Sequence, residues 1–304
     1  AFNTVYQLFD DLNKGRLEKA TDYLMLPCYF SYKLTGKKSH EYSNESTGAL
    51  LNAKSCNYDM ELLHKIGLPS KLFNKVEKPG YILGDLLPEI AKEVGGQTKV
   101  ILCASHDTGS AFEAVDVPED AIILSSGTWS LFGIKSKEPI CTEKSLKANF
   151  TNEGGVGYIR FLKNIMGMWI VNQVAEQEGI DFIKLIQTLD ECDYEETFDV
   201  NDSSLSAPKN MKKAVLKLLA HNPPKNDAEL FASIYRSLAK CYDATCKELE
   251  DVTGKTYNYI YIVGGGAKNQ YLNKLVEEYT GKKVVPLPIE ATSLGNIKIQ
   301  MKVN

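Results

Sequence analysis

The sequence predicts an α/β fold, because three of its segments pass from a β-rich apolar run into a tight turn or a helix. The first is the apolar run 99–105, which leads through Asp107 into a small-residue helix over 108–115. The second, AIILSSGTWSLFGIKS, predicts a β-hairpin whose turn contains Gly127 and Thr128. The third, YIYIVGGGAKNQYLNKLVEEY, predicts a strand, a glycine turn and a helix in succession.

The elements before Asp107 follow from helical periodicity and from the positions of proline and glycine. Apolar stripes over residues 3–26 predict two helices that meet near residues 13–15. A short helix should begin at Pro27 and end at Gly36, because glycine readily adopts the left-handed conformation of a helix cap. The string YDMELLHKIG predicts another helix ahead of Pro69, and residues 88–94 predict one ahead of the strand over 99–105.

A second unit is expected to begin near Pro118, which divides the chain into domains of residues 1–118 and 119–304. Residues 160–178 and 228–250 have the apolar spacing of amphipathic helices. The passage 192–224 is rich in Asp, Ser, Asn and Pro, which predicts loop around one short helix. The string KKVVPL predicts a final strand after the helix that follows the triple glycine.

Composition is typical of a globular enzyme that acts on a small metabolite. The net charge is -4 and no long Lys/Arg cluster occurs, which argues against nucleic acid as a partner. No apolar stretch approaches the roughly 20 residues that span a bilayer, and the first residues lack the order of a signal peptide. We therefore expect a cytoplasmic protein that does not contact membranes. The sequence leaves its oligomeric state open.

The cysteines and histidines do not predict a metal site. The seven cysteines are scattered, odd in number and never spaced as a CxxC pair, which also argues against a disulfide framework. The four histidines show no HExxH or comparable spacing that would present two imidazoles to one ion. We therefore expect no metal held by a protein cluster.

The segment SHDTGSA offers the groups that a phosphoryl-transfer enzyme needs near its acceptor. Asp107 could accept the proton of a substrate hydroxyl; on the residues alone, a helix-capping role is at least as well supported. His106 could bind a sugar hydroxyl, while a hydrogen-bonded core histidine is the simpler interpretation. Both roles therefore stay open at this level.

Two glycine-containing turns could bind phosphate. Gly127 and Thr128 could present backbone amides and a hydroxyl to phosphate oxygens, although a plain hairpin turn explains the same residues. Gly264, Gly265 and Gly266 could let a nucleotide lie against bare backbone near a helix N-terminus. The latter run is neither GxGxxG nor a Walker loop, and such junctions occur in many α/β proteins without any ligand.

The order of these segments closely resembles the FGGY carbohydrate kinases, and within that family the rhamnulokinase branch. The resemblance rests on SHDTGSA, LSSGTWSLFG, NEGGVGYIRFLKNIMGMW, IVGGGAKNQYLN and IEATSLGNIKIQ, and it extends upstream through FNTVYQL, YFSYKLTG and EYSNEST. It implies an actin-like ATPase fold of two lobes, each built on a ribonuclease H-like sheet, that closes on ATP, Mg²⁺ and a ketose. The implied reaction phosphorylates an alcohol group, with L-rhamnulose 1-phosphate as the expected product.

The resemblance also implies a role for each matching residue. Asp107 would be the general base on the sugar O1 hydroxyl, and His106, Thr108 and Asn164 would line the sugar site. Thr128, with Gly127, would meet the nucleotide phosphates. The triple glycine would lie beside the nucleotide, with Gly266 packed against the adenosine, and Asn172 falls where relatives generally carry a glutamine that reaches the nucleotide.

The sequence departs from the family pattern in three places, and these departures bear on how complete the two lobes are. Family members carry an Asp-x-Gly phosphate loop well before the FNTVYQL segment, relatives continue beyond LGNIKIQ, and Cys28 stands where they usually have Asp. We therefore expect an incomplete first lobe and a shortened second lobe, and no activity from this chain by itself. The alternatives are a kinase for L-fuculose, xylulose or glycerol, and a non-catalytic actin-like module that binds nucleotide and sugar.

Overall fold

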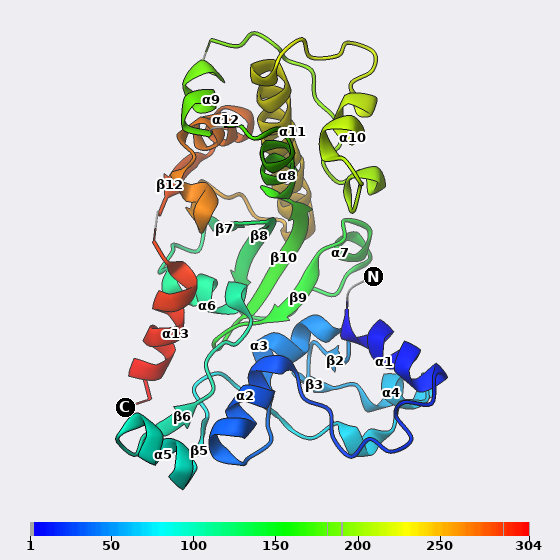
Figure 1. Ribbon diagram of the computed structural model, residues 1–304, viewed down its shortest axis with the longest axis vertical. Coiled ribbons are helices and arrows are strands. Elements are labelled where there is room, and N and C mark those ends of the chain that lie inside the picture. The colour runs from blue at the N-terminus through cyan, green and yellow to red at the C-terminus, as the bar shows by residue number, and fades with distance from the viewer. Residues whose placement is uncertain (1–2, 181, 190, 288, 304) are drawn as a thin grey trace.

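A computed structural model describes residues 3–180, 182–189, 191–287 and 289–303. The described chain has two parts, one above the other along its longest axis (Figure 1). The upper part contains a large sheet and most of the long helices. The lower part contains the N-terminal hundred or so residues, and the last helix returns to its edge.

The described part of the chain contains one six-stranded sheet, in the order β12-β11-β7-β8-β10-β9. Strands β7, β8, β10 and β9 are antiparallel neighbours, while β11 and β12 run parallel to β7 on its other side. Apart from the edge strand β9, three antiparallel strands are joined to two parallel ones, which is the order of the predicted ribonuclease H-like sheet. The bounds are β7 (Ala121–Ser126), β8 (Trp129–Ser136), β9 (Thr151–Gly154), β10 (Ile159–Met166), β11 (Tyr259–Val263) and β12 (Lys283–Pro286).

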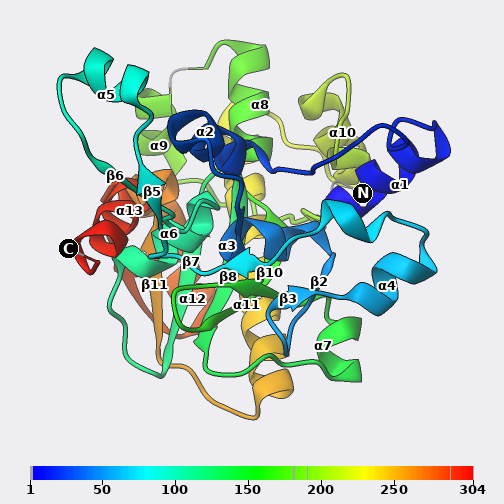
Figure 2. The same ribbon diagram turned by 90° about the horizontal axis from the view of Figure 1, so that it is seen from below.

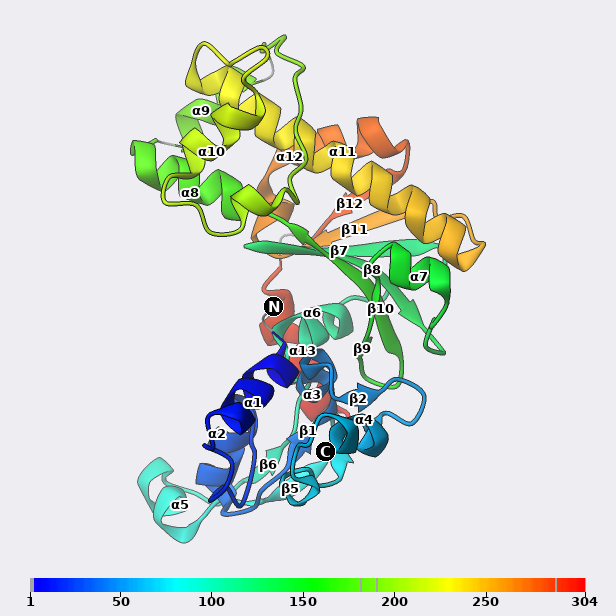
Figure 3. The same cartoon turned by 90° about the vertical axis from the view of Figure 1, so that its right-hand side faces the viewer.

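Helices cover both faces of this sheet (Figure 3). One face packs against the main hydrophobic core, to which the long helix α11 contributes a continuous apolar face that includes Phe231, Ile234 and Leu238. α11 begins at an Asn226 cap and ends at Gly254, whose left-handed backbone stops it. The helices of this part are α7 (Glu143–Lys147), α8 (Trp169–Glu178), α9 (Phe182–Leu189), α10 (Met211–Leu218), α11 (Asp227–Thr253) and α12 (Gln270–Thr280).

The other face of the sheet packs against a helix pair made of α6 (Asp107–Ala114) and α13 (Ala291–Met301). The two helices approach so closely that a Cβ on Gly295 would lie 1.8 Å from the carbonyl oxygen of Ser110. Lys302 Nζ reaches Glu113 Oε1 at 2.6 Å across the pair. The C-terminal helix therefore fixes the helix that begins at Asp107.

The lower part is built from short elements around a smaller core that includes Leu50, Leu63 and Leu72. Seen from below, α5 and the β5–β6 pair project on one side and α1 and α4 lie on the opposite side (Figure 2). Its helices are α1 (Thr4–Asn13), α2 (Leu26–Thr35), α3 (Tyr42–Glu45), α4 (Met60–Lys65) and α5 (Pro88–Val94). Its strands form three pairs: β1 (His40–Glu41) with β4 (Val76–Glu77), β2 (Leu51–Asn52) with β3 (Asn57–Tyr58), and β5 (Ile82–Asp85) with β6 (Lys99–Ile101).

Most predicted elements are confirmed. The helix from Pro27 is α2, and Gly36 ends it with φ of 71°. The helix over 88–94 is α5, the hairpin is β7–β8, and the glycine segment gives β11, a turn and α12. α10 is the short helix expected within 192–224, beside a single 3-10 turn at Ser203–Leu205.

Three predictions are wrong in part. Residues 160–178 are not one helix, because strand β10 comes first and α8 begins only at Trp169. β10 is buried on both faces, so its apolar residues lack the alternation that marks a half-exposed strand. The second helix expected before residue 26 is absent, and the strand over 99–105 is a three-residue, half-exposed strand, β6. No helix in the described residues is both long enough and apolar enough to cross a bilayer.

Candidate functional site

A cleft of about 390 Å³ lies where the start of α6 faces the turn between β7 and β8. Residues from the two predicted domains meet in it, which places the sugar-site and phosphate-site predictions around one space. Six predicted site residues line this cleft: His106, Asp107, Thr108, Gly127, Thr128 and Asn164. Ser125, Trp129 and Leu131 complete its lining.

Asp107 is an exposed carboxylate, with 79% of its side chain accessible. It is the first residue of α6, and its Oδ1 accepts hydrogen bonds from the Thr108 amide at 2.6 Å and the Thr108 hydroxyl at 3.2 Å. A capping side chain would bind the amides two or three residues further on, and the N-cap position belongs to His106. Asp107 therefore does not cap α6, and the hydrogen bonds of its carboxylate within the described residues are made by Oδ1.

His106 is partly buried beside this carboxylate. Its Nδ1 lies 3.4 Å from Asp107 Oδ1 and makes no hydrogen bond within the described residues. Burial lowers the pKa of His106, and the positive charge of Arg160 lowers it further. The imidazole is thus uncharged near pH 7. An uncharged ring can donate a hydrogen bond to a sugar hydroxyl through one nitrogen and accept one from a sugar hydroxyl through the other.

The β7–β8 turn is held by the N-terminus of α8. The amides of Met168 and Trp169 donate to the carbonyls of Gly127 and Thr128, at 3.1 and 3.0 Å. The Gly127 amide donates within the turn, to the carbonyl oxygen of Trp129 at 3.0 Å. The Gly127 amide is therefore not available to phosphate, and the exposed Thr128 hydroxyl is the group that the turn offers to the cleft.

The three glycines after β11 differ in what they contact. A Cβ on Gly264 would lie 2.8 Å from the carbonyl oxygen of Ser126, and one on Gly266 would lie 1.9 Å from Ser126 Oγ. Gly264 also has φ of +83°, which favours glycine. A Cβ on Gly265 would meet nothing within 4 Å. Gly264 and Gly266 are thus required by packing, and only Gly265 leaves open backbone.

Gly264 and Gly265 line a second cavity of about 100 Å³ that shares Ser125 with the first. Lys268, Glu290 and Thr292 are also in its lining, and sequence reasoning had not singled them out. Lys268 lies two residues after Gly266, and this closeness to the glycine run was the signal that could have found it. The Thr292 hydroxyl donates a hydrogen bond to the Asp107 carbonyl oxygen at 3.3 Å. Helix α13 therefore links a residue that lines the second cavity to a residue that lines the first.

Two predicted nucleotide residues do not line either cavity. Gly266 is buried against Ser126. Asn172 is exposed in the first half of α8, and its amide donates to the Met168 carbonyl in the ordinary helical pattern.

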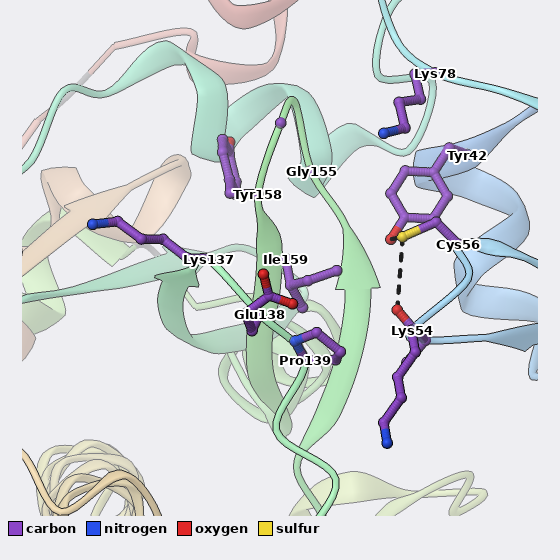
Figure 4. A pocket seen from close by; sticks show the side chains of 12 residues that line it. Tyr42, Lys54, Cys56, Lys78, Lys137, Glu138, Pro139, Gly155, Tyr158 and Ile159 are labelled. Carbon is purple, nitrogen blue, oxygen red and sulfur yellow. Dashed lines mark hydrogen bonds between the residues drawn. The ribbon is translucent and has the colours of Figure 1, made fainter.

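A separate cavity of about 220 Å³ lies between Tyr42, the 53–56 turn and the β9–β10 turn (Figure 4). Three lysines line it: Lys54, Lys78 and Lys137. Their side chains point in different directions (Figure 4), so they do not converge on one phosphate. Lys137 Nζ also lies 3.4 Å from Glu119 Oε1, an exposed ion pair.

The exposed carboxylate of Asp107 faces the Gly127–Thr128 turn, and the turn of Gly264, Gly265 and Gly266, here called the glycine corner, lies beside them. In an α/β protein, these are the site features expected of the sugar-kinase class. The chain belongs to the FGGY family of carbohydrate kinases. Its residues 2–112 match the N-terminal domain of that family, and residues 122–303 match the C-terminal domain.

Curated relatives support the same family. The chain is 40% identical over 308 residues to a rhamnulokinase from Oceanobacillus iheyensis, covering 99% of this chain and 66% of the relative. It is 39% identical over 310 residues to a rhamnulokinase from Bacillus subtilis, covering 99% of this chain and 64% of the relative. The chain thus spans slightly less than two thirds of the length of these relatives.

Solved structures share the fold at low sequence identity. A ligand-bound xylulose kinase from Lactobacillus acidophilus has a TM-score of 0.79 at 17% identity, with 99% of this chain and 63% of that chain covered. A glycerol kinase from Plasmodium falciparum, solved with ADP, has a TM-score of 0.74 at 14% identity, covering 98% and 63%. The predicted actin-like ATPase fold is therefore confirmed. The ribonuclease H-like sheet expected in the first lobe is not found among the described residues, whose strands in the lower part form two-stranded pairs.

Proposed function

We propose that the protein transfers the γ-phosphoryl group of ATP to a ketose, and that L-rhamnulose is the acceptor. The observation that supports this most is the position of Asp107, whose exposed carboxylate shares one cleft with Thr128 of the β7–β8 turn. The rhamnulokinase relatives, at about 40% identity, support the choice of sugar.

In this proposal Asp107 is the general base. Its Oδ1 is occupied by Thr108, so Oδ2 accepts the proton of the attacking sugar hydroxyl. As the new oxygen–phosphorus bond forms, the bond to the leaving ADP oxygen breaks, and the proton ends on the carboxylate. His106, Thr108 and Asn164 lie in the same lining, and we assign them to the sugar.

The nucleotide would extend from the β7–β8 turn to the glycine corner. Thr128 supplies a hydroxyl for phosphate oxygens, Lys268 supplies a positive charge, and Gly265 supplies open backbone. We assign Gly127, Gly264 and Gly266 to the shape of this surface, and Asn172 keeps the peripheral nucleotide role implied by its relatives.

The donor groups fit a magnesium ion that arrives with ATP. Within the described residues, no group of three or more His, Cys, Asp and Glu side chains is placed to hold a metal ion. Mg²⁺ in kinases is usually held by substrate phosphates and water with one or two carboxylates. Glu290, in the cavity that adjoins the Asp107 cleft, would be such a carboxylate. When bound, the ion neutralises charge on the phosphate oxygens.

The domain boundary near residue 118 forms part of the proposal, as does a cytoplasmic location, where ATP is available. The two family matches, which end at residue 112 and resume at residue 122, support the boundary. The first 118 residues would form the sugar lobe and the remainder the nucleotide lobe.

A substrate panel tests the choice of sugar. ADP release should be measured for the protein as its gene encodes it, with L-rhamnulose, L-fuculose, xylulose and glycerol at equal concentrations. The proposal predicts the highest kcat/KM for L-rhamnulose. A higher value for another acceptor would reassign the substrate, and sugar binding without ADP release would favour the non-catalytic module.

A further inference from the structure

Glu41 is a buried carboxylate that takes no part in the proposed chemistry. Only 1% of its surface is exposed. Its Oε1 accepts the Ser43 amide at 2.7 Å, and its Oε2 accepts the Ser43 hydroxyl at 2.7 Å and the Asn44 amide at 3.3 Å. Glu41 thereby caps the short helix α3.

The same carboxylate also holds the segment that leads into Asp107. Glu41 Oε2 accepts hydrogen bonds from the Ser105 amide at 3.0 Å and the Ser105 hydroxyl at 2.5 Å. These contacts join residues 64 positions apart in the sequence. A capping residue alone would not need them.

A second connection reaches His106. Its amide donates to Ser43 Oγ at 3.2 Å, and Ser43 Oγ in turn donates to Glu41. The amides of both residues before Asp107 are therefore anchored, one directly and one through Ser43. Ser43 also packs on α6, because a Cβ on Gly109 would lie 3.2 Å from the Ser43 Cβ.

Burial of this carboxylate has a cost that its hydrogen bonds offset only in part. Burial raises the pKa of Glu41, while the hydrogen bonds from Ser105 and Ser43 favour its ionised form. Hydrogen bonds to a carboxylate are shorter and stronger than those between neutral groups, and they fix geometry accordingly. The loop before Asp107 is thus held from within the first part of the chain.

We propose that Glu41 is a positioning residue for Asp107, acting through Ser105 and through Ser43 on His106. This inference rests on the proposed role of Asp107 as the base. Glu41 touches neither the cleft nor the substrate; it fixes the backbone from which the Asp107 side chain enters the cleft. Its loss should therefore lower kcat more than it changes the affinity for ATP.

A matched pair of variants tests this: Glu41→Gln and Glu45→Gln. Glu45 is equally buried and is the last residue of the short helix that Glu41 caps, but its carboxylate faces Tyr23 and His40. Misplacement of a catalytic group by about 1 Å costs on the order of 100-fold in rate. We expect Glu41→Gln to lower kcat by about 10- to 100-fold with KM for ATP nearly unchanged. Glu45→Gln, which also loses stability, should keep kcat.

Combining Glu41→Gln with Asp107→Asn distinguishes a positioning role of Glu41 from a general loss of stability. Residues that act as a unit show non-additive losses, so Glu41→Gln should lower kcat no further in an Asp107→Asn background. The same factor in both backgrounds, or equal kcat losses for Glu41→Gln and Glu45→Gln, would overturn the inference. Should Glu41→Gln fail to fold, Ser105→Ala replaces it, with the same prediction and the same contrary results.

The two proposals fail in different ways. If Asp107→Asn alone keeps normal turnover, the base assignment is wrong whatever the Glu41 variants do. If Asp107→Asn abolishes turnover and Glu41→Gln does not change it, the positioning role alone is wrong.

Discussion

Arg160 Nη2 donates a hydrogen bond to the carbonyl oxygen of Ser43 at 3.4 Å, which ties strand β10 of the large sheet to helix α3 of the lower part. Arg160 is fully buried, its Nε donates to the Gly154 carbonyl at 2.7 Å, and its Nη1 lies 3.2 Å from Glu153 Oε2. The guanidinium therefore holds the β9–β10 hairpin against the segment that carries Glu41 and Ser43.

Replacing Arg160 with Met should destabilise the protein strongly, because it leaves Glu153 buried without its cation. Removal of one partner of a buried pair costs about 3–5 kcal/mol. Chemical denaturation measures this loss. The double variant Arg160→Met with Glu153→Leu should recover part of it, and an equal or greater loss in the double variant would contradict the explanation.

Gly295→Ala should separate α13 from α6. The added Cβ would lie 1.8 Å from the Ser110 carbonyl oxygen, so the helices must move apart. Overpacking of this kind costs about 1–3 kcal/mol. Thermal unfolding should show a lower Tm, whereas the exposed neighbour variant Ser293→Ala should leave it unchanged. A Tm equal to the wild-type value would mean that the pair is loosely packed.

Gly265→Ala and Gly266→Ala should affect different properties. Gly266→Ala places a Cβ 1.9 Å from Ser126 Oγ and should lower the Tm, while Gly265→Ala has open space. If the nucleotide lies along Gly265, Gly265→Ala should raise the KM for ATP by roughly tenfold, equivalent to about 1.4 kcal/mol. An unchanged KM for ATP would place the nucleotide elsewhere.

His106 should make stability depend on pH. Its pKa is lowered from 6.5 in the folded state, chiefly by burial, so the unfolded chain binds the proton more readily. The stability from the neutral ring is full above about pH 6.5 and falls as the pH drops below that value. Denaturation of wild type and His106→Gln at pH 5 to 8 measures it. The difference in unfolding free energy between them should shrink toward pH 5; a constant difference would contradict the assignment.

How far the sequence could predict this molecule depends on the kind of feature. Gly36 and Pro88 mark helix ends through local backbone chemistry, so these boundaries are confirmed. Strand β10 could not be told from a helix, because a strand buried on both faces lacks alternation.

The residues of the site also divide into those that local sequence could predict and those that depend on distant contacts. Asp107, Thr128 and Asn164 could be named in advance from segments that resemble a known family, and the structure brings them to one cleft. Glu41 and Arg160 could not, because their role depends on contacts with residues 64 and 117 positions away. Only the folded chain reveals such contacts.

The most direct test of the central claim is the kcat of Asp107→Asn in the protein as its gene encodes it, with Asp85→Asn as the control. Asp85 is an exposed aspartate on β5, away from the cleft. Loss of a general base should lower kcat by about 10²- to 10⁴-fold, with KM for ATP nearly unchanged, while Asp85→Asn keeps full turnover. Near-normal ketose phosphorylation by Asp107→Asn would show that this carboxylate is not the base.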